Sequence, residues 1–396
     1  MMTSSDQQPA ASSPRAALPY LPGLDGLRAI AVVAVLAYHG GLALYGGFLG
    51  VETFFALSGF LITALLLAEW RQRGSIDLAA FWRRRALRLL PALFLLLAVT
   101  GAGVALLMPE ELGQLAADIA AALAYLMNWH LIWSERSYFD PSMRPPLLQH
   151  LWSLAVEEQF YLIWPLLVAL ALRAVGRGGL LALTLAATAA SGAWMAALYD
   201  PGADPSRVYY GTDTRAAGLL LGAALAMVWQ PGRLPWATSR AAGRALDLAG
   251  VAGLGGLALA YLQLFESHPL LYRGGFLLVA LCTAATIAGA THPQARALPA
   301  LLGWAPLRWL GVRSYGIYLW HWPVFLVTRP GLDLPLSGAP AALLRLGLVV
   351  GLAALSYRFV EAPARRGVPL RRLLEAGALW LRRPATRAAA AAGPGR

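Results

Sequence analysis

Apolar stretches of about twenty residues recur along almost the whole chain, separated by short connections rich in arginine. A helix rises about 1.5 Å per residue, so a stretch of this length crosses the roughly 30 Å hydrocarbon core of a bilayer. Only 13% of the 396 residues are charged and 58% are hydrophobic, whereas a soluble domain has about 25% charged residues. We therefore expect an all-α, polytopic membrane protein.

The arginines indicate the orientation, because basic loops favour the cytoplasmic side. The connection at residues 71–88 is the richest in arginine, so it and the N-terminus are predicted to be cytoplasmic. Counting residues 116–132 as a crossing segment would place the later arginine-rich loops outside. If residues 116–132 do not cross the membrane, the chain has about ten transmembrane helices and both termini are cytoplasmic. The predicted helices are at residues 24–44, 49–69, 89–108, 150–172, 180–199, 214–230, 246–265, 273–290, 312–328 and 342–360.

This topology divides the chain into one membrane domain and two tails. Residues 1–19 are polar and rich in Pro and Ser, which predicts a disordered cytoplasmic tail. Residues 20–366 form the membrane domain, and within it residues 109–149 are predicted to be an outer loop with an interfacial or re-entrant helix. Residues 367–396 are predicted to be a second cytoplasmic tail, rich in Arg and Ala.

Several functional classes have no support in the composition. The sequence contains no lysine, which excludes lysine nucleophiles and the phosphate-loop lysine. The single cysteine, Cys282, lies in an apolar stretch, so no disulfide framework or zinc knuckle is expected, and we predict no metal. The net charge of +12 comes from arginines in short loops, where topology requires them, so nucleic acid is not an expected partner.

The first apolar stretch, residues 24–44, carries ionisable side chains. Asp25 and Arg28 lie near its start and His39 lies toward its end. Arg28 and His39 are eleven positions apart, about three turns, so they share one face of a helix roughly 16 Å apart along its axis. An ionisable group in hydrocarbon costs at least about 3 kcal/mol. We therefore expect His39 to face an interior or aqueous cavity and to do chemistry there; the alternative is a histidine that only joins two helices.

The segment HLWSLAVEEQFYLIWP contains the second group of polar residues. Ser153 and Glu157 are four positions apart and share a helix face, whereas Glu158 points about 100° away. Under the predicted topology Glu157 and His39 both lie in the outer half of the membrane, so a carboxylate–histidine pair is allowed. The alternative is that the two acids sit in headgroup water.

Three further groups enter predicted spans. Arg84 and Arg88 share a face at the cytoplasmic rim, where guanidinium groups either bind phosphates or only mark topology. Asp213 and Arg215 enter the sixth span. The remaining polar residues lie in or near the ninth span, and they are Ser314, Tyr315 and His321.

Seven segments, taken in order, resemble the integral-membrane acyltransferase-3 family, whose members are O-acyltransferases of surface and exported carbohydrates and of some secondary metabolites. The resemblance covers about residues 20–366. The segments are LDGLRAIAVVAVLAYH, GGFLGVETFFALSGFLI, FWRRRALRLLPAL, HLWSLAVEEQFYLIWP, DTRAAGLLLGAALA, RSYGIYLWHWPVF and FVEAPARR.

The resemblance implies roles for particular residues. The family's essential histidine maps to His39, as general base or transient acyl carrier, and its Arg-x10-His pattern begins at Arg28. The Arg-x3-Arg element falls on Arg84 and Arg88, which the resemblance links to an acyl-CoA co-substrate. The WSLxxE motif places Glu157 in the catalytic group. The residues that we expect to contact the acceptor are Asp25, Trp152, Ser153, Asp213 and Arg215.

The function that the resemblance implies is transfer of an acyl group, most often acetyl, from cytoplasmic acyl-CoA to a hydroxyl of a cell-envelope or exported carbohydrate. Expected partners are the lipid bilayer of the bacterial cytoplasmic (inner) membrane and a carbohydrate or lipid-linked glycan acceptor; a homo-oligomer stays open. About 35 residues follow the last predicted span, so we expect the membrane domain to act alone or with a partner. The alternatives are the same chemistry on a macrolide-type molecule, or a transporter or flippase.

Overall fold

A computed structural model describes residues 19–139, 145–230 and 239–367. The predicted tails, at 1–19 and 367–396, lie almost wholly outside the described residues. Within the described ranges the secondary structure is helical, apart from one isolated β-bridge between Pro330 and Leu334. The prediction of an all-α fold is confirmed.

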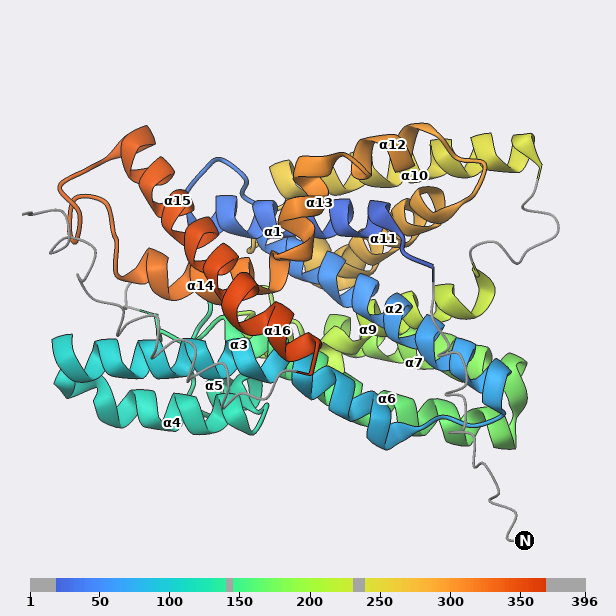
Figure 1. The fold of residues 1–396 in the computed structure, drawn as a ribbon, viewed down its shortest axis with the longest axis horizontal. Coiled ribbons are helices and arrows are strands. Elements are labelled where there is room, and N and C mark those ends of the chain that lie inside the picture. The colour runs from blue at the N-terminus through green and yellow to red at the C-terminus, as the bar shows by residue number, and fades with distance from the viewer. Residues whose placement is uncertain (1–18, 140–144, 231–238, 368–396) are drawn as a thin grey trace, which may run out of the picture.

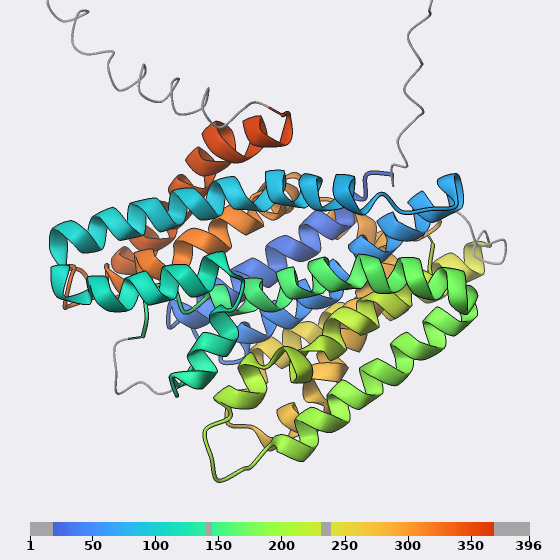
Figure 2. The same cartoon turned by 90° about the horizontal axis from the view of Figure 1, so that it is seen from below.

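The chain forms a bundle of packed helices, with its first two helices crossing its middle (Figure 1 and Figure 2). The helices of the first half are α1 (Pro22–His39), α2 (Gly50–Arg73), α3 (Leu78–Leu107), α4 (Leu112–Leu123), α5 (Met127–Trp133), α6 (Leu151–Ala174), α7 (Gly176–Leu198) and α8 (Ser206–Tyr210). Those of the second half are α9 (Thr212–Val228), α10 (Arg240–Gln263), α11 (Phe276–Thr291), α12 (Ala297–Leu302), α13 (Ala305–Val312), α14 (Ser314–Leu326), α15 (Gly338–Ser356) and α16 (Ala362–Arg365). Single turns of 3₁₀ or π-helix are Gly47–Leu49, Pro109–Glu111, Leu271–Gly275 and Tyr357–Glu361.

Seven helical segments in the described ranges are long and apolar enough to cross a membrane. They are Gly47–Arg73, Leu78–Leu107, Leu151–Ala174, Gly176–Leu198, Arg240–Gln263, Leu271–Thr291 and Gly338–Arg365. The other three predicted spans, at 24–44, 214–230 and 312–328, correspond to α1, α9 and α13–α14 and are not among the seven. The total of ten spans and the side of each terminus stay predictions.

Burial separates inner helices from outer ones. The most apolar part of α2 is 83% buried, whereas those of α3, α7 and α10 are each 28% buried. All of α14 except Tyr315 is buried, and α1 packs against α2, α11, α12, α13 and α14. Inner helices are covered by protein rather than lipid, so they tolerate charged residues and do not need the full length of a span.

The first span differs from its prediction at the outer end. The helix ends at His39 rather than continuing to residue 44. Gly40 and Gly41 follow, and Gly41 adopts a φ of 70°, in the left-handed region that favours glycine and ends helices. His39 is therefore the last residue of α1, with the turn on its outer side.

Residues 109–149 contain two short helices rather than one long one. Helix α4 has 12 residues, or about 18 Å, too short to cross alone. Tyr125 separates it from α5 with a φ of 54°. That residues 109–149 form an uncrossed outer loop stays a prediction; residues 140–144 lie outside the described ranges.

Glycines allow α2 and α9 to approach each other at backbone distance. A Cβ atom at Gly59 would overlap the carbonyl oxygen of Leu219, and one at Gly222 would overlap that of Ala56. Close backbone approach through small residues is how membrane helices gain van der Waals contact without a hydrophobic driving force. The α2–α9 contact holds Glu52 and Arg215, described below, in the interior.

We expect Gly59→Ala to lower the midpoint of thermal unfolding in detergent, because the new methyl group meets Leu219 backbone that cannot move aside. Gly103→Ala on α3 is the matched control: its Cβ would meet no atom within 4 Å, and glycine to alanine inside a helix is otherwise stabilising by about 0.5–1 kcal/mol. Equal midpoints for the two variants would show that α2 and α9 are not held together at Gly59.

Candidate active site

Helix α1 delivers His39 to a cluster of polar side chains from three separate parts of the chain. Its Nδ1 lies 3.0 Å from Nε2 of His321 on α14, and its Nε2 lies 2.9 Å from the hydroxyl of Tyr138 in the connection between α5 and α6. The Tyr138 backbone N–H in turn donates to the Ser206 hydroxyl at 2.8 Å. The position of His39 therefore depends on three tertiary contacts.

The hydrogen bonds determine which nitrogen carries each proton when both imidazoles are neutral. His321 Nδ1 lies 2.5 Å from the backbone carbonyl oxygen of Tyr318, which can only accept, so this nitrogen carries the proton. His321 Nε2 is then an acceptor, and it receives the proton on His39 Nδ1. His39 Nε2 consequently keeps its lone pair and faces Tyr138.

Tyr138 is the donor at this nitrogen. Burial raises the pKa of the Tyr138 phenol well above its ordinary value, so the hydroxyl stays protonated. The result is a directed chain in which Tyr138 donates to His39 and His39 donates to His321. The same logic, with a carboxylate in the place of His321, prepares a histidine to accept a proton in hydrolases.

Aromatic rings enclose His39 and His321. Trp322 meets His39 edge-on with ring centroids 4.7 Å apart, and Tyr38 does so at 5.1 Å. His150, at the start of α6, lies 5.6 Å from the ring of His321 and uses Nε2 to contact the Leu319 carbonyl oxygen at 3.0 Å. His321 and His150 stand out in the sequence as polar residues in apolar stretches, whereas no sequence signal marks Tyr138.

Glu157 lies in a different polar group from His39. Its carboxylate accepts hydrogen bonds from the hydroxyls of Ser58 and Tyr161. Both ring nitrogens of His39 have other partners, so the carboxylate–histidine pair that the sequence allowed is not formed here.

Three of the other predicted residues line a cavity of about 40 Å³, which we call the inner cavity. Arg28, Ser153 and Glu157 line it together with Tyr315 and Tyr318. Ser153 contacts the Tyr318 hydroxyl at 2.7 Å. The structure thus brings Arg28, Ser153 and Glu157 to one place. The cavity is much smaller than the 300–1,000 Å³ typical of ligand sites, so it suits a narrow chain rather than a ring.

The two arginines that we expect to bind the donor, Arg84 and Arg88, lie on α3. Arg84 is exposed and forms an ion pair with Glu69 at 3.7 Å. Arg88 interacts electrostatically with Arg28, Glu158 and Glu361. The cavity that Arg28 lines therefore has a second arginine beside it. Asp25 does not line the cavity: its carboxylate accepts a hydrogen bond from Tyr20 at 2.7 Å and interacts electrostatically with Arg28.

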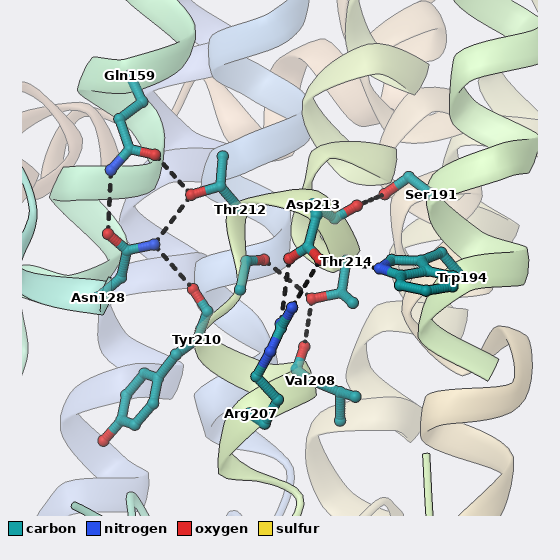
Figure 3. Close-up of polar contacts among 11 residues, drawn as sticks. Asn128, Gln159, Ser191, Trp194, Arg207, Val208, Tyr210, Thr212, Asp213 and Thr214 are labelled. Atoms are coloured by element: carbon teal, nitrogen blue, oxygen red, sulfur yellow. Dashed lines mark hydrogen bonds and ion pairs between the residues drawn. The ribbon is translucent and has the colours of Figure 1, made fainter. Parts of the chain in front are cut away.

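Asp213 sits in a dense hydrogen-bond network at the start of α9 (Figure 3). Its carboxylate accepts from Arg207 at 2.8 and 3.1 Å and from the Trp194 indole at 2.9 Å. The neighbouring network links Gln159, Asn128 and Thr212, and Asn128 also donates to the Tyr210 carbonyl oxygen at 3.1 Å. In this structure Asp213 anchors the α8–α9 corner.

Trp152 and Arg215 do not line the inner cavity. Trp152 is buried, and its ring lies 4.6 Å from the ring of Tyr209. Arg215 is buried beside the same tyrosine and pairs with Glu52, a residue that the sequence analysis did not single out. Tyr209 also lies 4.6 Å from Tyr138, ring to ring, so it joins Arg215 to the histidine cluster.

Comparisons with known proteins agree with this picture. The chain is 44% identical over 349 residues to the peptidoglycan O-acetyltransferase OatA of Listeria monocytogenes, covering 88% of this chain and 56% of that protein. It is 42% identical over 354 residues to the putative peptidoglycan O-acetyltransferase YrhL of Bacillus subtilis, covering 87% of this chain and 55% of that one. It is 38% identical over 348 residues to the O-acetyltransferase OatA of Staphylococcus aureus, covering 88% and 57%.

The chain thus spans little more than half the length of these relatives. No solved structure matches it. A family described as an acyltransferase domain matches residues 21–358, which include all of α1 to α15 and every residue of the histidine cluster. The chain therefore belongs to the acyltransferase-3 family.

Proposed function

We propose that this chain is a membrane O-acetyltransferase that transfers acetyl from acetyl-CoA at the cytoplasmic face to a hydroxyl of a cell-wall carbohydrate. The proposal rests on the directed hydrogen-bond chain that leaves His39 Nε2 unprotonated, with its lone pair accepting a hydrogen bond from a hydroxyl. The names of the Listeria monocytogenes and Bacillus subtilis relatives favour a peptidoglycan sugar over a macrolide as the acceptor. Family membership favours group transfer over a transporter.

In this proposal His39 acts as a general base. Its Nε2 accepts the proton of the acceptor hydroxyl while the hydroxyl oxygen attacks the thioester carbonyl carbon. The carbon–sulfur bond then breaks. The CoA thiolate leaves and accepts the proton from the His39 imidazolium, which yields an ester and free CoA. The acceptor hydroxyl has to replace the Tyr138 hydroxyl at this nitrogen, so Tyr138 marks where it binds.

The donor is proposed to reach His39 from the arginine side. Arg84 and Arg88 at the start of α3 bind the CoA phosphates, because guanidinium groups bind phosphate in a bidentate manner. The narrow cavity beside Arg28 then accommodates the thioester arm. Glu157 carries no proton to or from His39 in this scheme: it orients the cavity wall through Ser58 and Tyr161.

We expect His39→Ala to lower acetyl transfer at least about 100-fold, because a positioned general base contributes 10²–10⁴-fold. The measurement is ester formation on a peptidoglycan glycan fragment by purified protein in lipid vesicles, with the protein level in the membrane as the control. Full activity in this variant would remove His39 from the mechanism.

A second prediction concerns the partner of His39. His321→Leu removes the acceptor for the Nδ1 proton, so kcat should fall roughly 100-fold while KM for acetyl-CoA stays unchanged. His321→Gln has a similar size and supplies both a carbonyl acceptor and an N–H donor, so it should recover most of the activity. If the two variants lose activity equally, His321 only fills space.

The proposed donor site makes a third prediction. The double variant Arg84→Ala/Arg88→Ala should raise KM for acetyl-CoA about tenfold or more, because two charge-assisted contacts to phosphate are lost. Arg83→Ala, an exposed arginine on the same helix, is the matched control. An unchanged dependence on acetyl-CoA concentration would leave Arg84 and Arg88 as topology signals only.

A further inference from the structure

A second and larger cavity, of about 330 Å³, is lined by Glu52 and Arg215 together with further residues of four helical segments. Its walls come from α7, α9, the start of α11 and the π-helical turn Leu271–Gly275, and Glu52 of α2 reaches it from the interior. Its lining includes Glu52, Gly192, Arg215, Tyr272, Arg273 and Phe276. The volume falls at the small end of the range for ligand sites, about 300–1,000 Å³, which is room for one small ring but not for a polymer.

Arg215 is the polar residue of this cavity whose bonding is least complete. Its side chain is 0% exposed, and one terminal nitrogen lies 2.7 Å from a carboxylate oxygen of Glu52, which is 2% exposed. Among the described residues, no group accepts an aligned hydrogen bond from Nε or from either terminal nitrogen. A buried donor without an acceptor costs about 1–3 kcal/mol, and more when it is charged. The guanidinium therefore lies at the wall of the cavity with incomplete hydrogen bonding.

The chemistry of the cavity fits a sugar better than a phosphate. Glu52 supplies acceptor oxygens beside the donors of Arg215, and the two charges cancel. A sugar hydroxyl both donates and accepts, so it can bridge such a pair, whereas the Glu52 carboxylate would repel a phosphate. Phe276 packs against the guanidinium at 3.8 Å, and with Tyr272 it adds an apolar wall for the carbon face of a ring. Arg273 is exposed and adds a positive charge at the edge.

The cavity shares a wall with the histidine cluster. The guanidinium carbon of Arg215 lies 5.2 Å from the centre of the Tyr209 ring. That ring lies 4.6 Å from the ring of Tyr138, whose hydroxyl is 2.9 Å from His39 Nε2. Arg215, Tyr209 and Tyr138 thus form a continuous series of contacts from the cavity wall to the proposed base.

We propose that this cavity binds one sugar residue of the acceptor glycan, with its hydroxyls on Glu52 and Arg215 and its ring against Phe276 and Tyr272. The inference rests on the proposed function and names where its acceptor binds. Donor and acceptor then use separate cavities, the thioester the inner cavity and the sugar this one.

Arg215→Ala is not a useful test, because it would leave the buried Glu52 charge unpaired and destabilise the fold. The test instead fills the cavity and leaves the ion pair intact. Gly192 on α7 lines the cavity, and a Cβ atom there would meet no atom within 4 Å. A leucine at this position enters the cavity with no backbone clash. Gly178→Leu is the matched control, since Gly178 lies on the same helix with equally open space and does not line the cavity.

The assay uses purified full-length chain in vesicles with acetyl-CoA and a disaccharide of N-acetylglucosamine and N-acetylmuramic acid. We expect Gly192→Leu to raise KM for the disaccharide at least tenfold and to leave KM for acetyl-CoA unchanged, with Gly178→Leu like the wild type. A wild-type KM for the disaccharide in Gly192→Leu overturns the acceptor site. Absence of transfer by the wild type itself would instead overturn the proposed function.

A phospholipid is the competing occupant. Native mass spectrometry of wild type and Gly192→Leu, both taken from the same vesicles, counts the lipids that each protein retains. Equal lipid counts together with the raised KM support the sugar site. If Gly192→Leu retains one phospholipid fewer and its KM for the disaccharide is unchanged, the cavity binds lipid and the proposal is overturned.

Discussion

The fold depends on the rule that polar groups within a bilayer must find their partners inside the protein. Helices α3, α7, α10 and α15 present apolar residues outward, and they cover α1, α2, α9 and α14, which hold the charged and aromatic residues. This division explains why Glu52, Arg215 and His321 lie on the inner helices. It also explains why Glu52 and Arg215 form an ion pair at the closest α2–α9 contact: neither charge has water available, so each requires the other.

The candidate site is organised around one ring with two differently occupied nitrogens. His321 takes the Nδ1 proton of His39, and Tyr138 donates to its Nε2. A ring held in this way needs no carboxylate partner, because the backbone carbonyl of Tyr318 fixes the proton of His321 and so the tautomer of the whole chain. Two separate cavities accompany this ring, a narrow one with Arg28 and a larger one with Arg215.

Several parts of the site follow from local sequence and others do not. Helical spacing correctly placed Ser153 and Glu157 on one side, where both line the inner cavity with Arg28. Spacing within a helix cannot say which neighbouring helix a side chain meets, and for this reason the allowed pairing of Glu157 with His39 gave way to Ser58 and Tyr161. The predicted end of the first span was too late by several residues, since apolar composition continues past the glycines that end the helix at His39. No sequence feature marked Tyr138 as a site residue, because nothing in the sequence distinguishes it from any other tyrosine in a polar loop.

The sequence by itself determined the membrane class, the all-helical fold, the family and the unusual histidine at the end of the first helix, because hydropathy, arginine placement and ordered motifs are properties of the chain read locally. Only the tertiary structure decided which groups touch that histidine. His39 and His321 are 282 positions apart, and His39 and Tyr138 are 99 apart. Contacts over such separations arise when helices pack, and no periodicity in the sequence records them. The same holds for the Glu52–Arg215 cavity, whose walls come from four elements that meet only in the folded bundle.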